Sequence, residues 1–412
     1  MKISKINYPY KDSWDVKKNY LTFDVEGVDN TFVNALRRIM LTDIKYIGFK
    51  TRPYEESEIN VVVNETTMDN QKLTHRIGLV PMHIEYPEEF DVHDYQFYID
   101  KKNTGNDIIE VTSKDFKIKK LSHNKELSTK EVESFFPPNP LTKEHMFICY
   151  LLPDKTGTGE KGGKVHFTAK ASIKTSRTDA KYNVAQTSFI NKQDPDLVEK
   201  GWKDYYEEHK NEATKAALEK RFRLTDAYRH FHVDEYGHPN KFEFFVESYV
   251  SMRPLVILYK SFEILSAKLI TFNNNLKKGN YSEVDVYPSE TDMNAFDILI
   301  NRETHTLAAL LQSYITRYFV QVKDLVSYVG FTKPHPLKDT VLLRIAMKEE
   351  QNNKDNIIKV IDKTIEQLLK LIQAGMKQLI KQSDVSNYLK GINKKALKAN
   401  EDNITDDDDE DM

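Results

Sequence analysis

The sequence predicts an α+β protein built from two similar units that pair through two long helices. Two apolar stripes with helical spacing occur, within residues 255–272 and 358–379. The segments before the stripes suggest the same series of strands and a shorter helix in both halves. Neither half has enough core to bury a long apolar stripe alone. We therefore expect the two long helices to bury each other as a pseudo-twofold pair.

The first unit opens with a strand, a helix and a second strand. Apolar and polar residues alternate at the start, as in a half-buried strand; the apolar ones are Leu21, Phe23 and Val25. Asn30 is suited to cap the next segment. Apolar residues recur there at helical spacing: Phe32, Leu36 and Ile39. Residues 44–49 then predict the second strand.

A β-rich lobe is predicted to interrupt the first unit at about residues 51–184. It contains a strand at residues 61–63, a helix at residues 69–77 and a strand at residues 165–174. The stretch 87–140 is polar and is punctuated by prolines and asparagines, so we expect it to be irregular.

The first unit resumes after the lobe, so its two parts occupy about residues 1–50 and 185–280. Residues 192–230 are rich in Lys, Glu and aromatic residues and predict an exposed helix. Alternating apolar residues predict a strand at residues 242–246, and Pro254 suits the first turn of a helix. The stripe of that helix steps by three and four residues: Leu255, Leu258, Phe262, Leu265, Leu269 and Phe272.

A polar stretch at residues 273–283 is expected to be a linker, and the second unit occupies about residues 281–395. This unit repeats the first in miniature, with strands at 296–300, 326–329 and 341–345 and a helix at 305–318. Its final helix carries the second stripe: Ile358, Ile361, Ile365, Leu368, Ile372, Met376 and Leu379. Gly375 within that helix costs about 1 kcal/mol relative to alanine, so we expect a packing reason for it.

The composition is typical of a globular protein with a heavily charged surface. Of the 412 residues, 39% are hydrophobic and 30% are charged, with a net charge of −3. Acidic residues fill positions 406–411, so we expect residues 396–412 to form a disordered tail. The single cysteine, Cys149, excludes an internal disulfide and a four-cysteine zinc site, and favours a reducing, intracellular compartment. No apolar run approaches the ~18–20 residues that span a bilayer, so we expect no membrane association.

Three stretches resemble components of multi-subunit DNA-dependent RNA polymerases. Residues 30–40 (Asn-Thr-Phe-Val-Asn-Ala-Leu-Arg-Arg-Ile-Met) resemble the signature helix of the bacterial alpha subunit, of the third-largest subunit of eukaryotic RNA polymerase II and of its archaeal counterpart. Residues 75–82 (His-Arg-Ile-Gly-Leu-Val-Pro-Met) resemble a further element of the eukaryotic and archaeal versions. Residues 305–311 and 329–337 are similar to the eleventh subunit of RNA polymerase II and to the archaeal protein that corresponds to it.

The resemblance implies two alpha-type dimerisation units, the first with an inserted lobe, and the function of a non-catalytic assembly platform. In the family, the paired units recruit the two largest subunits, which form the active centre. Arginine forks suit bidentate carboxylate contacts, and neighbouring arginines about 100° apart on a helix can share one exposed edge. The implied large-subunit interface contains Asn34, Arg37, Arg38, His75 and Arg76.

The resemblance also implies which residues pair the two units within the chain: Leu258, Phe262, Leu265, Leu269, His305, Leu307, Leu310, Ile361, Ile365, Leu368 and Ile372. Among these, His305 begins a helix that Thr304 can cap, and we interpret it as a packing residue. No catalytic residue, cofactor or metal is implied. A small zinc subunit of the tenth or twelfth type is a further expected partner, and DNA and RNA are expected to be contacted only through the complex.

The two units are usually separate chains in this family. A chain that carries both looks like the fused subunit of some large eukaryotic DNA viruses, which would place it in the host cytoplasm or viral factory and in the virion. The eukaryotic third subunit has a zinc-binding cysteine cluster after its Gly-Leu-(apolar)-Pro element, and this chain has no cysteine there.

Other interpretations of the same residues stay open. A standalone transcription-regulatory scaffold is an alternative with the same fold. Arg37 and Arg38 could be a solvated basic edge, and His75 could be a hydrogen-bonded structural histidine. A metal-dependent enzyme is a third alternative, since His230, His232 and Asp234 alternate; exposed histidines are the ordinary explanation.

Residues 157–162 fit the pattern Gly-x-Gly-x-x-Gly but precede a predicted strand instead of a helix. A phosphate would therefore meet no helix N-terminus, and we interpret the run as a turn.

Overall fold

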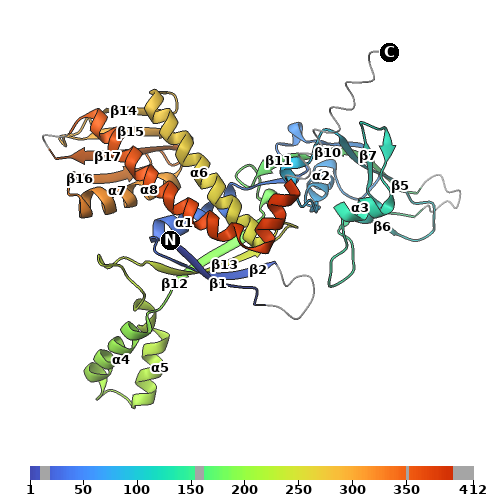
Figure 1. The fold of residues 1–412 in the computed structure, drawn as a ribbon. Coiled ribbons are helices and arrows are strands. Elements are labelled where there is room, and N and C mark those ends of the chain that lie inside the picture. The colour runs from blue at the N-terminus through green and yellow to red at the C-terminus, as the bar shows by residue number, and fades with distance from the viewer. Residues whose placement is uncertain (10–18, 154–161, 349–351, 393–412) are drawn as a thin grey trace.

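The computed structural model describes residues 1–9, 19–153, 162–348 and 352–392. Two four-stranded antiparallel sheets and four helices form the main body of the protein (Figure 1). A β-rich lobe and a helical hairpin extend from this body in different directions. The acidic tail and the first five residues of the glycine-containing run at 157–162 lie outside the described residues.

The first sheet has the strand order β1-β2-β13-β12, with helices α1 and α6 packed on it. These elements are β1 (Lys2–Asn7), β2 (Tyr20–Glu26), α1 (Asn30–Thr42), β12 (Ala185–Asn191), β13 (Lys241–Ser248) and α6 (Pro254–Lys278). Asp29, and not the expected Asn30, caps α1, because its carboxylate accepts a hydrogen bond from the backbone N–H of Phe32 at 2.9 Å. Helix α6 extends through much of the expected linker, since Leu276 continues its buried stripe.

The second sheet has the order β14-β15-β17-β16 and therefore the same topology as the first. The elements of this unit are β14 (Val284–Pro288), β15 (Phe296–Asn301), α7 (His305–Ile315), β16 (Val326–Thr332), β17 (Thr340–Met347) and α8 (Lys354–Ile380). Helix α7 ends before the expected residue 318 and continues as a π-helix over Thr316–Val322. The predicted α+β fold of two related dimerisation units is confirmed.

The second strand expected in the first unit forms but belongs elsewhere. As β3 (Lys45–Gly48), it pairs with β11 (Ser172–Thr175) and does not join the first sheet. The strand expected at residues 165–174 is consequently two strands, β10 (Lys164–Lys170) and β11, which lie in different sheets. Sequence periodicity identified these strands, but strand pairing depends on distant segments that periodicity does not specify.

The lobe contains a five-stranded sheet of order β4-β10-β5-β7-β8, a two-stranded sheet and two helices. Its remaining elements are β4 (Ile59–Asn64), α2 (Asn70–Gly78), β5 (Tyr95–Lys102), β6 (Ile109–Thr112), β7 (Lys117–Lys120), β8 (Lys125–Glu126), α3 (Thr129–Phe135) and β9 (Phe147–Leu151). The expectation that residues 87–140 are irregular is wrong, because β5 to β8 and α3 lie there. Strands such as β7 and β8 contain too few apolar residues to show the alternation that predicts a strand. For example, β7 is Lys-Ile-Lys-Lys, in which only Ile118 is fully buried.

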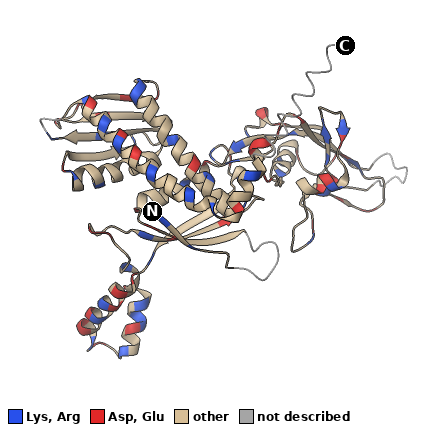
Figure 2. Cartoon of the chain, viewed as in Figure 1, with Lys and Arg blue, Asp and Glu red and all other residues tan. Residues whose placement is uncertain are grey.

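A helical hairpin, formed by α4 (Pro195–His209) and α5 (Lys215–Leu224), occupies the segment in which one exposed helix was predicted. It projects from the body between β12 and β13 (Figure 1). Both helices carry acidic and basic residues (Figure 2), as expected for helices that are largely solvated. Phe222 and Leu218 are buried and hold the two helices together, with Trp202 packed 5.7 Å from the Phe222 ring.

The long helices α6 and α8 pack against each other, and each also contacts the outer strand of the opposite unit: α6 contacts β14, and α8 contacts β1. This reciprocity gives the pair its pseudo-twofold character. At most 1% of the surface is exposed in each of the stripe residues that were expected to pair the units: Leu258, Phe262, Leu265, Leu269, Ile361, Ile365, Leu368 and Ile372. The units therefore share one hydrophobic core.

Residues 383–392 form a further helical segment that returns from α8 to the first unit. The Tyr388 ring stacks on Tyr86 with 5.2 Å between centroids, and its hydroxyl donates to Glu88 at 3.1 Å. The Tyr8 hydroxyl donates to Asp384 at 2.6 Å. These contacts attach the end of the second unit to the lobe, through Tyr86 and Glu88, and to the N-terminal part of the first unit, through Tyr8.

Candidate functional site

Helix α1 supplies three of the expected interface residues, which lie on its exposed side. Asn34 and Arg38 are half-buried and line a hollow of about 320 Å³ that also includes Phe189 of β12. The opposite wall comes from the second unit, through His305 and Thr306 at the start of α7. We call this hollow, with its nine lining residues, the seam hollow: Asn30, Thr31, Asn34, Ala35, Arg38, Phe189, His305, Thr306 and Ala309.

Arg37 lies next to the seam hollow and is held by its own helix. Its Nε and Nη2 atoms donate to the Asn34 side-chain oxygen at 3.1 and 2.9 Å. Burial, and then the neighbouring charge of Arg38, lower the pKa of Arg37. Neither arginine forms an ion pair with a carboxylate in the described part of the chain. The edge of α1 therefore presents two cations whose charge is not neutralised within the described residues.

His305 occupies a different environment from the one we expected. Thr304 caps α7, accepting from the Thr306 N–H at 3.5 Å, but the His305 side chain is exposed and not packed between the units. Its ring lies edge-on to Phe331, 5.7 Å between centroids. The first turn of a helix directs its side chain outwards at this position, whereas Leu307 and Leu310 are buried, as expected for the dimer contact.

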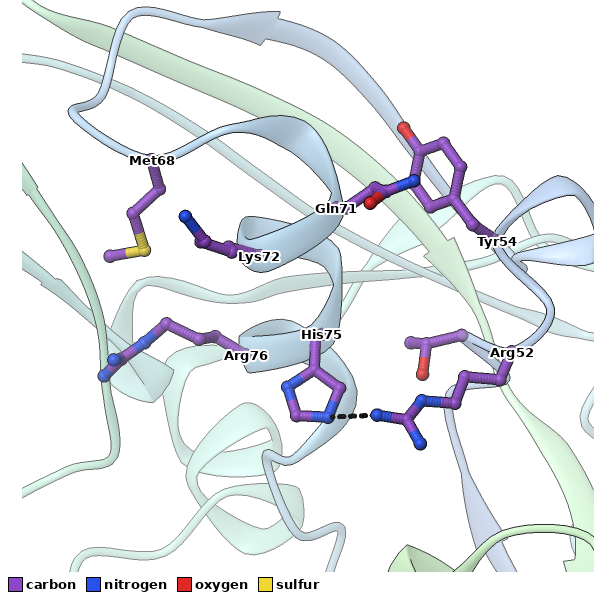
Figure 3. Close-up of a pocket in the computed structure, with 8 residues that line it drawn as sticks. Arg52, Tyr54, Met68, Gln71, Lys72, His75 and Arg76 are labelled. Carbon is purple, nitrogen blue, oxygen red and sulfur yellow. Dashed lines mark hydrogen bonds between the residues drawn. The ribbon is translucent and has the colours of Figure 1, made fainter.

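Helix α2 supplies the other two expected interface residues, in a separate hollow of about 470 Å³ (Figure 3). His75 and Arg52 point toward each other, with 3.5 Å between the His75 Nε2 and Arg52 Nη2 atoms. Lys72 and Arg76 lie on the same helix. No acidic residue lines this hollow, which we call the lobe hollow: Thr51, Arg52, Tyr54, Met68, Gln71, Lys72, His75 and Arg76.

Arg76 is positioned by the two-stranded sheet of the lobe. Its guanidinium lies over the Phe147 ring, 4.9 Å from the centroid, and Nη2 reaches the Phe147 carbonyl oxygen at 3.4 Å. The aromatic face supports the cation without neutralising it. Lys72, by contrast, forms an ion pair with Asp69 at 3.1 Å, exposed on both sides. The lobe hollow can therefore bind an anionic group mainly through Arg52 and Arg76.

The two hollows share no residue, so the five expected interface residues form two separate basic surfaces. Sequence reasoning missed Arg52 and Lys72, and also Phe189 and Thr306. A helical projection of residues 69–77 places Lys72 within one turn of His75 and Arg76, which is a signal that could have identified it. Arg52 comes from a separate loop and carries no such signal.

Ion pairs and hydrogen bonds connect the two units around the seam hollow. Ser313 of α7 donates to the Asp29 carboxylate that caps α1. Lys268 of α6 lies 3.0 Å from Asp43, at the end of α1, and 3.4 Å from Glu303, which precedes α7. These contacts fix α1 relative to α7, and hence Arg38 relative to His305.

The histidines of the metal-site alternative do not converge. His232 Nδ1 pairs with Asp194 at 2.9 Å, whereas the Asp234 carboxylate lies 3.3 Å from Arg317 of the second unit. His230 packs on the Phe222 ring, 5.8 Å between centroids. Within the described ranges, no group of three or more His, Cys, Asp or Glu residues could hold a metal ion. Nor does any helix in these ranges have the length and apolar character needed to cross a membrane.

Two α+β units with matching sheets and a shared helical core define a protein whose fold is organised around dimerisation. Residues 22–269 match a family model described as the RNA polymerase Rpb3/Rpb11 dimerisation domain, and residues 295–378 match a second model with the same description. The chain belongs to this RNA polymerase dimerisation-domain family.

Curated relatives match shorter parts of the chain. The DNA-directed RNA polymerase subunit Rpo3 of Methanosphaera stadtmanae is 34% identical over 107 residues, covering 23% of this chain and 37% of the relative. The human DNA-directed RNA polymerases I and III subunit RPAC1 is 27% identical over 115 residues, covering 24% and 30%. A conjugation stage-specific protein of Tetrahymena thermophila is 22% identical over 183 residues, covering 39% and 52%. The chain thus spans about a third of the first two relatives and about half of the third.

Proposed function

We propose that this chain is a non-catalytic assembly platform of a multi-subunit DNA-dependent RNA polymerase, in which both alpha-like halves are fused in one chain. The observation that carries the proposal is the pairing of two family-type units within the chain: α6 and α8 bury each other's apolar stripes. A dimer that ordinarily needs two chains is thereby formed in one. Two names among the relatives, Rpo3 and RPAC1, support the connection to RNA polymerases.

In this proposal, the two largest polymerase subunits dock on the basic surfaces of α1 and α2. The support is chemical. Arg37 and Arg38 have no carboxylate partner among the described residues, and the same is true of Arg52 and Arg76. Unpaired guanidinium groups at fixed positions favour carboxylates of a partner protein through bidentate hydrogen bonds. A small zinc subunit completes the proposed assembly, and DNA and RNA are reached only through it.

The experiment that tests this proposal is purification of the tagged chain from its native source, followed by identification of its partners by mass spectrometry. We expect two very large polymerase chains in stable, stoichiometric association. Recovery of the chain without either large subunit would overturn the proposal and would favour a standalone transcription-regulatory scaffold. The purified chain alone is expected to catalyse no nucleotide transfer.

The fused arrangement also supports a source in a large eukaryotic DNA virus, because the two units are usually separate chains in this family. The proposed location is then the host cytoplasm or viral factory, with packaging in the virion. Mass spectrometry of purified particles tests this: the chain should occur at a constant ratio to the large polymerase subunits, and its absence from particles that contain those subunits would contradict packaging.

A further inference from the structure

The lobe hollow is a basic surface for which a binding partner exists within the same chain. Four of its eight lining residues are Arg or Lys or His, and none is acidic. The strongest concentration of acid in the sequence is the run 406–411, Asp-Asp-Asp-Asp-Glu-Asp. We propose that this acidic run binds the lobe hollow of its own chain, where Arg52 and Arg76 contact its carboxylates and Lys72, which also pairs with Asp69, lies beside them.

The end of the described chain lies close enough for this contact. Gly391 packs against the Tyr86 hydroxyl so tightly that a Cβ atom there would collide with it. Ten residues lead from Arg76 to Tyr86, and ten residues of chain span at most about 36 Å. Fifteen residues lead from Gly391 to Asp406, enough to span about 50 Å. The acidic run can therefore reach the lobe hollow without any change in the helices.

Charge complementarity and tethering favour this occupant. Arg52 is exposed and has no carboxylate partner among the described residues, while Arg76 lies against the Phe147 ring and a carbonyl oxygen. A tether converts a weak contact into an intramolecular one, with an effective concentration in the millimolar range for a short connection. Six neighbouring acids meeting guanidinium groups give short, charge-assisted hydrogen bonds that salt weakens.

The consequence rests on the proposed function. His75 and Arg76 line the lobe hollow, and the same residues are proposed to receive a large subunit. The acidic run would then cover this surface in the free chain and leave it when the partner docks. It acts as an internal competitor that protects the basic surface from other anionic molecules before assembly.

Zero-length carbodiimide cross-linking of the full chain tests the contact directly, because this reagent joins a carboxylate to a nearby lysine amine. We expect a cross-link between Lys72 and residues 406–411 at low salt, and its loss in about 0.5 M salt. The exposed Lys200 and Lys203 on α4 serve as reference amines. No Lys72 cross-link, or equal cross-linking of the tail to these reference lysines, would overturn the proposal.

A matched pair of variants distinguishes binding of the acidic run in the lobe hollow from general electrostatic attraction between the run and basic residues of the surface. Arg52→Gln combined with Arg76→Gln removes two charges from the hollow but retains Lys72, and should reduce its cross-link to the tail at least fivefold. Lys203→Gln, on the distant hairpin, should leave that cross-link unchanged. An unchanged cross-link in the double variant would contradict binding in the hollow. No other polymerase component is present, so this result does not depend on whether large subunits dock.

Discussion

Gly375 of α8 lies directly against the Phe262 ring of α6. A Cβ atom built on this glycine would be 3.1 Å from the Phe262 Cζ atom and would also collide with the Met1 methyl group. The glycine in the second stripe therefore leaves room for the Phe262 ring of the other long helix. We expected a packing reason for a glycine inside this helix, and the close contact with Phe262 confirms it.

Gly375→Ala should destabilise the protein although alanine is the better helix former. The propensity gain is about 1 kcal/mol, whereas overpacking a well-packed core costs about 1–3 kcal/mol. The Met1 side chain can move aside, but the Phe262 ring is 1% exposed and confined. Urea unfolding should give a lower midpoint than wild type. Gln373→Ala, at an exposed position of α8, is the control and should be neutral or slightly stabilising; a gain in stability for Gly375→Ala would contradict the packing role.

Truncation of two neighbouring residues of α6 should destabilise the protein to different extents. Leu269 is fully buried between the units, whereas 44% of Ile270 is exposed. Leu269→Ala should lower the free energy of unfolding by about 2–5 kcal/mol, because it leaves a cavity in the shared core. Ile270→Ala should cost under about 1 kcal/mol. Equal costs in denaturant unfolding experiments would mean that α6 faces its partner differently from the arrangement described above.

Reversal of one charge on α1 tests the proposed docking surface. Arg38→Glu should reduce recovery of the large subunits at least about tenfold, since reversing an arginine that contacts partner carboxylates costs on the order of 2 kcal/mol or more. The fold should be unaffected, because Arg38 has no ion-pair partner in the described chain. Co-purification with each tagged large subunit measures the effect. Lys203→Glu on α4 is the matched reversal; if both variants lose the partners equally, α1 has no special role.

Acid should weaken the packing of α1 within the first unit through Asp43, at the end of that helix. Burial on its own would raise the pKa of Asp43, but the Lys268 charge and hydrogen bonds from Thr42 and Arg177 outweigh it and lower the pKa. A carboxyl whose pKa is lower in the folded state stabilises the protein above its unfolded value of about 3.9, and this contribution disappears as pH falls through the folded pKa.

Asp43→Asn should therefore lower the melting temperature at pH 7 and have a smaller effect near pH 3. Melting curves between pH 3 and 7 for wild type and variant measure this difference. Asp204→Asn, at an exposed position of α4, is the control and should change little at either pH. A melting-temperature difference for Asp43→Asn that stays constant over this range would show that the carboxylate does not stabilise the first unit by its charge.

The long helices were predictable because a periodic stripe depends only on neighbouring residues. The first stripe is buried at every predicted position, from Leu255 to Phe272. The second is buried at five of its seven predicted positions, whereas Ile358 and Met376 are only half-buried. The strands of the lobe were not predictable in the same way. In β7, a single apolar residue, Ile118, is surrounded by lysines whose alkyl chains and charges stay near solvent, so no alternation is visible.

The proposed site was predictable only in part. The motif on α1 indicated Arg37 and Arg38, and the motif on α2 indicated His75 and Arg76. The role of His305 was harder to predict, since a helix start next to apolar residues suggests packing, and only the fold shows its ring exposed on the far wall of the seam hollow.

The sequence by itself determined the two-unit organisation. Each apolar stripe is formed by residues three and four positions apart in the sequence, and each long helix needs a second helix of similar length to bury its stripe. Only the tertiary structure decided which basic side chains lie together. Arg52, on the loop before β4, lies 3.5 Å from His75 on α2, and Arg38 faces His305 across the seam between units. The two residues of each pair come from segments that are far apart in the sequence. The distance between their side chains depends on how the sheets and helices pack, and no local pattern of residues predicts that packing.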